Sequence, residues 1–261
     1  MNATLREAWR TVVPDPNDRH GPLPPLMLLL TVVTGLVDAF SYLVLGHVFV
    51  ANMTGNVIFA GFGIAGAPGF SLTATAVAVA AFTAGAALGG RVLHSVRPHR
   101  ARILQLAGAV QTLLLTGAFL VAEVTGAPAG AGSRGLLIAL LGVGMGVQNA
   151  ATRALAVPDL TTTVLTLTLT GTAADSRLAR GAGSKAGRRL LSMAAMFLGG
   201  LIGALLVLHG QPALALLLAI LLLVIVSGTA GRLTRSSAPW TLPVGAPGAA
   251  SAPRPAAGLP S

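Results

Sequence analysis

The chain has 261 residues, of which 54% are hydrophobic and 9% are charged, and its mean hydropathy is +0.79. Soluble domains carry roughly 25% charged residues, so the composition excludes a soluble fold and predicts an all-α polytopic membrane protein. The absence of cysteine excludes disulfides and thiol chemistry, and the net charge of +10 is better explained by basic loops beside membrane spans than by nucleic acid.

The N-terminal region is polar, so we expect residues 1–23 to form a cytoplasmic segment without a cleavable signal peptide. Eight apolar segments follow it in the chain: Pro24–Gly46, Phe49–Gly66, Phe70–Val92, Ile103–Val124, Gly135–Leu155, Leu160–Ala174, Leu190–Leu208 and Pro212–Gly228. The end of the chain is rich in Pro and Ala, which predicts a disordered cytoplasmic tail over residues 231–261.

Two of these segments, 49–66 and 160–174, are short, and the basic residues indicate whether they cross the membrane. Lys and Arg concentrate in cytoplasmic loops. Six spans with both termini inside place 16 of the 17 Lys and Arg residues in cytoplasmic stretches, with only Arg134 outside. Eight spans would leave about five of them outside. We therefore predict six transmembrane helices and two broken or re-entrant segments, the first of which enters from outside.

A weak internal repeat divides the membrane region into halves, residues 24–124 and 135–230, joined by an external loop at 125–134. The sequence "GLVDAFSYL" from Gly35 aligns with "GVQNAATRA" from Gly146 at an offset of 111 positions, and "ANMTGN" aligns with "TVLTLT" at an offset of 112. Three spans per half require opposite orientations. The sequence thus predicts two inverted repeats, a recurring design of secondary transporters.

Two Gly-x-x-x-Gly pairs continue the repeat. Gly85 and Gly89 align with Gly199 and Gly203 at an offset of 114 positions. Such pairs let helices approach closely. They would join either the two halves or two protomers of a homo-oligomer, and ordinary small-residue packing is the interpretation we favour.

The motif "TGLVDAFSYLVLGHVFVANMTGNVIFAG", with "GMGVQNAATRA" and a Thr-rich second segment, resembles the YoaK family of bacterial multi-pass membrane proteins. The resemblance covers roughly residues 24–230. It implies a six-span inner-membrane protein with a domain of unknown function, and it implies no substrate. The family usually carries Thr-Gly-Thr where this chain has Thr166-Leu167-Thr168, so the second broken segment is expected to be more regular here.

Asp38 is an ionisable residue deep inside an apolar segment, about 21 Å along its helix. An ionisable group at that depth is costly and marks a candidate functional site. Alternatively, Asp38 caps a break in the helix or accepts hydrogen bonds from Ser41 and Tyr42. Asn149 occupies the matching place in the second half, beside Gln148, so a proton or cation site there would combine one charge with neutral ligands.

Asn52, Thr54 and Asn56 surround Gly55 in the first short segment. In a lipid-facing helix they would only cost free energy. At a helix break formed by Gly55, they would satisfy freed backbone groups and could also present oxygen atoms to a polar cavity. We expect one such cavity, lined by the candidate substrate- or ion-binding residues Asp38, Ser41, Tyr42, Asn52, Thr54, Asn56, Gln148, Asn149, Thr166 and Thr168.

The function that we favour from the sequence is a secondary transporter or permease for a small polar or weakly charged solute, coupled to protons or cations through Asp38. A channel and a non-transporting membrane partner or assembly protein are the alternatives. We expect no enzyme, catalytic residue, metal site or cofactor, because no HExxH, Walker A or Ser/His/Asp set is found. The expected partners are the lipid bilayer and a small-molecule solute.

Overall fold

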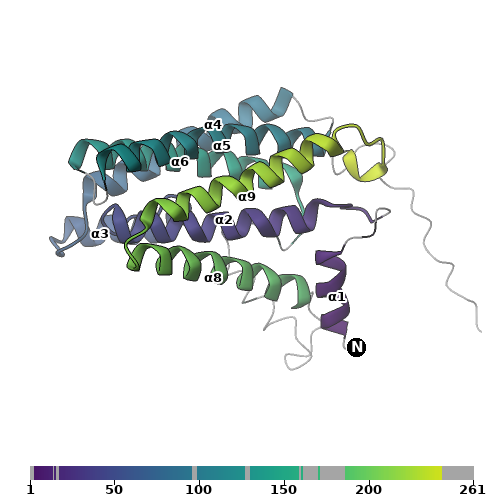
Figure 1. The fold of residues 1–261 in the computed structure, drawn as a ribbon, viewed down its shortest axis with the longest axis horizontal. Coiled ribbons are helices and arrows are strands. Elements are labelled where there is room, and N and C mark those ends of the chain that lie inside the picture. Colours follow the sequence, from purple (N-terminus) through teal and green to yellow (C-terminus); the bar gives the residue numbers. More distant parts are fainter. Residues whose placement is uncertain are drawn as a thin grey trace, which may run out of the picture.

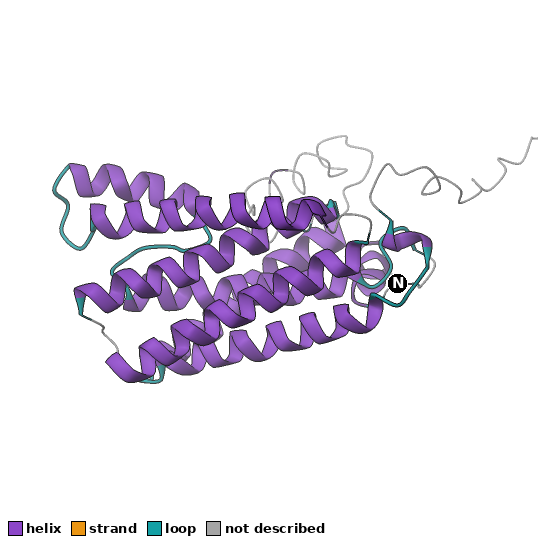
Figure 2. Cartoon of the chain, turned by 90° about the horizontal axis from the view of Figure 1, so that it is seen from above, coloured by secondary structure: helices purple, strands orange, loops and turns teal. Residues whose placement is uncertain are grey.

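The structure is a computed structural model that describes residues 3–13, 15, 18–95, 99–126, 130–158, 160, 170 and 186–242. These described residues form helices and connecting loops, without strands (Figure 2). Six of the helices are long and apolar enough to cross a membrane: α2 (Leu23–Val44), α4 (Leu72–Ser95), α5 (Arg100–Thr125), α6 (Ala131–Leu155), α8 (Ala186–Leu208) and α9 (Pro212–Leu233). The prediction of an all-α protein with six long apolar helices is therefore confirmed.

The six long helices lie side by side, with the short helix α1 (Ala3–Val12) crosswise at one end of the bundle (Figure 1). The second short helix, α3 (Met53–Ile64), lies at the opposite end and packs against α4. Helix α2 packs mainly against α8 and α9, while α6 packs against α4 and α5. The chain leaves the bundle at the end where it entered, as an even number of spans requires (Figure 1).

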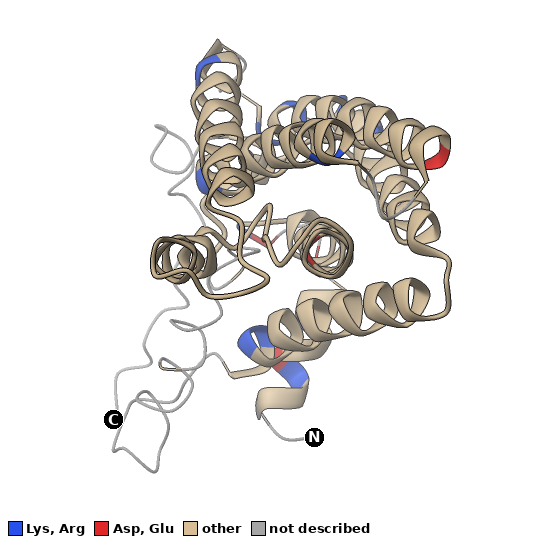
Figure 3. Cartoon of the chain, turned by 90° about the vertical axis from the view of Figure 1, so that its left-hand side faces the viewer, with Lys and Arg blue, Asp and Glu red and all other residues tan. Residues whose placement is uncertain are grey.

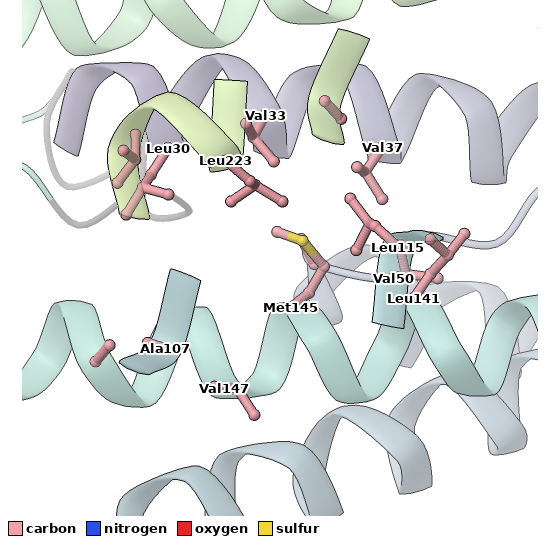
Figure 4. Packing of buried hydrophobic residues seen from close by; sticks show 14 of the residues in the cluster. Leu30, Val33, Val37, Val50, Ala107, Leu115, Leu141, Met145, Val147 and Leu223 are labelled. Atoms are coloured by element: carbon pink, nitrogen blue, oxygen red, sulfur yellow. The ribbon is translucent and has the colours of Figure 1, made fainter. Parts of the chain in front are cut away.

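The core lies between α2 and α6, and the side chains labelled in Figure 4 come from α2, α5, α6, α9 and the loop before α3. Val50, from the loop before α3, is fully buried in it. Among its other members are Leu30, Val33, Val37, Leu115, Leu141, Met145 and Leu223. Apart from Asp38, the charged residues avoid this region, and most of the bundle in Figure 3 carries no charge. In the six long helices, every charged residue except Asp38 lies within four residues of a helix end.

Glycines on α4 let it approach α6 closely. A side chain at Gly85 would collide with the main chain of Val143, and the Cβ of a residue at Gly89 would lie 3.0 Å from the Cα of Val147. These contacts join the two halves within one chain, which is one of the two arrangements that the Gly-x-x-x-Gly pairs allow.

Glycines on α8 make the equivalent contacts with α2. A side chain at Gly199 would collide with the carbonyl of Val32, and the Cβ of a residue at Gly203 would lie 3.1 Å from the carbonyl oxygen of Leu36. Each glycine of α8 follows its counterpart on α4 by 114 positions, and each contacted residue on α6 follows its counterpart on α2 by 111 positions. The contacts thus reproduce two of the three offsets found in the sequence, 111 and 114.

The first part of the expected tail is folded. Residues 231–233 complete α9, and a short 3-10 helix, η2 (Pro239–Thr241), follows it. Trp240 is only 4% exposed, because its indole packs against Gly21, where a Cβ would lie 2.5 Å from the ring. The prediction that the disordered tail begins at residue 231 was therefore wrong, because residues 231–233 and 239–241 are helical.

Candidate functional site

The first short segment turns back into the bundle. Helix α2 ends at Val44, and the chain then returns along α2 before α3 begins at Met53. Asp38 lies six residues before the end of α2, or about 9 Å at 1.5 Å per residue, yet it contacts the main chain of Val50 and Ala51. The loop therefore descends by about this distance, and α3 starts at the depth of Asp38, as a re-entrant segment would.

The carboxylate of Asp38 holds the loop in place. Its Oδ1 accepts hydrogen bonds from the N–H groups of Val50 (3.0 Å) and Ala51 (2.9 Å), and its Oδ2 accepts one from the side-chain amide of Asn52. Asn52 directly precedes α3, so the negative charge lies at the N-terminus of that helix, where the helix dipole favours it. This is the geometry of the capping alternative. Ser41 donates instead to the main-chain carbonyl of Asp38 (3.2 Å).

Asn56 closes the same loop from its other side. Its side-chain amide donates to the carbonyl of Phe49 (2.6 Å), and its Oδ1 accepts from the N–H of Phe49 (2.9 Å). Gly55 lies in the first turn of α3, where a Cβ would be 2.8 Å from the Phe49 ring. The helix break thus lies at 45–52 rather than at Gly55. Thr54, the remaining candidate of this segment, is exposed.

Aromatic rings cover the loop at this end of the bundle. Tyr42 stacks on Phe49 at 5.0 Å between ring centroids and meets the edge of His47 at 5.1 Å. His47 adopts a positive φ of 56°, and its Nδ1 lies 3.0 Å from the carbonyl oxygen of Gly69. Phe59, Phe62 and Phe70 complete the cluster. Tyr42 therefore contributes an aromatic contact to the loop that Asp38 caps.

A second polar group lies among α2, α5 and α6. Gln111 donates to the Oε1 of Gln148 at 2.8 Å, and Gln148 donates to the Oγ1 of Thr34 at 2.9 Å. All three side chains are at most 1% exposed. Gln148 was among the candidate residues predicted from the sequence, but its two partners were not. Gln111 could have been found, because it is an amide in the middle of an apolar segment.

The candidate residues thus fall into two groups with different partners. Asp38, Asn52 and Asn56 hold the loop before α3, whereas Gln148 joins three helices through Thr34, which lies one helical turn from Asp38 on α2. Asn149 donates to the carbonyl of Met145 in its own helix at 2.9 Å. Thr166 and Thr168 lie outside the described residues. Convergence of all ten on one cavity stays a prediction.

A buried arginine ties together the bundle end that carries α1 and η2. Arg100 is 2% exposed and donates to the carbonyl oxygens of Leu155, Arg19 and Trp240. It also lies 3.3 Å from the Nδ1 of His20. Burial, together with the charge of Arg100, lowers the pKa of His20 from 6.5 to about 4. His20 is therefore neutral at pH 7 and can accept a hydrogen bond from the guanidinium.

These features define a polytopic α-helical membrane protein in which a buried carboxylate holds the loop before a short seventh apolar helix, α3. In the part of the chain that the structure describes, no three His, Asp or Glu side chains gather as a metal site would require. The family described as "Protein of unknown function (DUF1275)" matches residues 26–228, and the chain belongs to this family.

A curated relative is the UPF0700 transmembrane protein YoaK of Bacillus subtilis (strain 168), which is 30% identical over 149 residues. The alignment covers 55% of this chain and 63% of the relative, so the chain matches less than two thirds of that protein's length. No solved structure matches the chain. The resemblance to the YoaK family is thereby confirmed.

Proposed function

We propose that this protein is a secondary transporter or permease that moves a small polar or weakly charged solute across the bacterial inner membrane. The observation that carries this proposal is the equivalence of the glycine contacts, in which α4 meets α6 as α8 meets α2. Two halves that repeat one contact pattern at fixed offsets are expected of inverted repeats, and inverted repeats with a discontinuous helix recur in secondary transporters.

The helix directions support the inverted relation. Residue numbers rise together along the contact of α2 with α8 and along that of α4 with α6, so each of these pairs is parallel. Helices α5 and α9 run antiparallel, because Gln105 lies beside Gly231 while Gly108 lies beside Ser227. Exchanging the two halves turns the α2–α8 contact into the α6–α4 contact and maps the α5–α9 contact onto itself.

The proposed moving parts are the two parallel pairs, each of which takes one helix from each half. Helix α3 bridges them, because its body packs against α4 while the residues directly before it, Ala51 and Asn52, are held by Asp38 on α2. Protonation of Asp38 would remove its charge and one acceptor position, which would weaken its hold on the loop. Proton binding at Asp38 would thereby be coupled to relative movement of the pairs.

We place the end with α1 and η2 in the cytoplasm. Five long helices carry an arginine within four residues of that end, namely Arg91, Arg100, Arg153, Arg188 and Arg232, as the positive-inside rule predicts for a cytoplasmic side. In cells, an impermeant thiol reagent should label Ala65→Cys and spare Ser95→Cys and Ser237→Cys, all at solvent-accessible positions. Labelling of Ser95→Cys from outside would reverse the orientation.

The transport proposal is tested in vesicles that contain the full chain. Panels of labelled amino acids, sugars, polyols and small organic acids are offered to vesicles preloaded with the same unlabelled solute. A carrier accumulates label by counterflow, whereas a channel only equilibrates it. Asp38→Asn should abolish accumulation driven by a proton gradient and leave counterflow measurable. Uptake of no solute from any class would favour the non-transporting membrane partner.

A further inference from the structure

We propose that α1 is an interfacial helix that lies in the cytoplasmic leaflet and binds anionic lipid headgroups. Its side chains form three faces. One docks on the bundle, one is apolar and exposed, and one is basic. The assignment of the leaflet rests on the proposed orientation, whereas lipid contact does not depend on transport.

The first face docks α1 on α8. A side chain at Gly187 would collide with the main chain of Thr4 and lie 2.7 Å from the N–H nitrogen of Ala8. The N–H of Gly187 donates to the Glu7 carboxylate at 3.1 Å, and Thr11 is fully buried. Helix α1 is therefore held against the first turn of α8 on one defined side.

The second face is apolar and uncovered. Leu5, Trp9 and Val12 repeat at the helical spacing of four and three positions, and they are 59%, 62% and 48% exposed. Successive residues of a helix are about 100° apart, which places this stripe roughly 120° around α1 from its docking face. A stripe of this kind beside a membrane is typical of a helix that lies in the interface.

The third face is basic. Arg6 and Arg10, one turn apart and both exposed, lie on the remaining side of the helix, roughly 130° from the docking face in the other direction. With the apolar stripe in the acyl region, these guanidinium groups would lie at the level of the headgroups. Their charge is complementary to anionic lipids, which attract juxtamembrane basic residues.

The position of α1 favours lipid as the occupant of the stripe. Helix α1 lies crosswise at the end of the bundle (Figure 1), as a helix in the plane of a leaflet would. It docks at the start of α8, whose outer surface is apolar from Leu190 at 48% exposed to Phe197 at 66% exposed. Exposed apolar side chains thus occur on both of the helices that meet at this docking contact.

Spin labels on the full-length protein test this proposal. Because the chain has no cysteine, Leu5→Cys, Val12→Cys and Arg10→Cys each give one nitroxide. In vesicles of phosphatidylcholine and phosphatidylglycerol, the labels at positions 5 and 12 should be reached several-fold better by oxygen than by a water-soluble nickel complex. The label at position 10 should show the reverse preference.

Arg6→Gln and Arg10→Gln test the headgroup contact. Removing phosphatidylglycerol should shift the wild-type α1 from a lipid-immersed toward a lipid-free position. Each substitution should lower the effect of phosphatidylglycerol on this equilibrium constant roughly fivefold. Equal nickel access at positions 5, 10 and 12 would overturn the proposal. Shielding of positions 5 and 12 from both reagents would also overturn it, because the stripe would then be covered by protein. Neither result depends on solute transport.

Discussion

Replacing Asp38 should release the loop before α3, by an amount that depends on which hydrogen bonds the new side chain keeps. In Asp38→Leu, the N–H groups of Val50 and Ala51 and the amide of Asn52 all lose their acceptor. Val50 and Ala51 are at most 3% exposed, so water cannot replace the carboxylate there. Each unsatisfied buried donor costs about 1–3 kcal/mol, so the two buried main-chain donors should together lower the unfolding free energy by roughly 2–6 kcal/mol.

The Asp38→Asn variant separates geometry from charge. Its carbonyl oxygen can still accept from the two main-chain N–H groups, but its new amide faces the amide of Asn52, so two donors meet. We expect a loss of about 1–3 kcal/mol. Adding Asn52→Asp exchanges donor and acceptor across this contact and should recover about 1–2 kcal/mol of that loss in a double-mutant cycle.

Unfolding in detergent measures these losses, and hydrogen exchange of the peptide that covers residues 46–56 reports the loop directly. The amides of Val50 and Ala51 should exchange faster in Asp38→Leu than in Asp38→Asn, since local opening needs less free energy there. Equal losses in the two variants, or unchanged exchange at these amides, would refute the assignment of Asp38 as the group that holds the loop.

Three further substitutions test the packing and the two other polar groups. Gly199→Ala should lower the unfolding free energy by about 1–3 kcal/mol, because its Cβ would meet the main chain of Val32. Gly200→Ala should be neutral or stabilising, because nothing lies within 4 Å of its Cβ position. Similar melting temperatures of the two variants would contradict this contrast. The pKa of His20 is about 4 when folded and 6.5 otherwise, so the wild type should lose about 1–3 kcal/mol as the pH falls from 6.5 to 4, and His20→Gln should not show this component. Gln148→Leu should destabilise by about 1–3 kcal/mol, and adding Gln111→Leu should cost less than additivity requires, because it removes the stranded amide; strict additivity would show that the two side chains act independently.

The transmembrane helices could be predicted from the sequence because a span is specified locally by its apolar length. Helix α2 was expected at Pro24–Gly46 and is found at Leu23–Val44. The depth of Asp38 follows from the same count along the helix. The hydrogen-bond partners of Asp38 could not be predicted in this way, because they depend on how far residues 45–52 return into the bundle. That distance depends on the packing of Val50 in the core.

Long-range contacts were the main feature that could not be predicted. Arg100 looks like an ordinary loop charge beside a span, yet it is buried because Leu155 and Trp240, far away in the sequence, bring carbonyl groups to it. The helix α1 was missed for another reason. The region around it is polar on average, and the three-residue stripe that starts at Leu5 becomes significant only when its helical spacing is considered.

The first half has Asp38 where the second half has Asn149. Exchanging these residues tests whether Asp38 acts through its charge or through its hydrogen bonds. Asn149, the counterpart of Asp38, donates to the carbonyl of Met145, so Asn149→Asp would set a carboxylate against that carbonyl and should cost about 1–3 kcal/mol. Combined with Asp38→Asn, it should restore neither stability nor gradient-driven uptake, because the donors that need a carboxylate lie at residues 50–52. Recovery in the double variant, measured by unfolding and by uptake, would mean that one negative charge in either half is sufficient and that its contact with the loop is incidental.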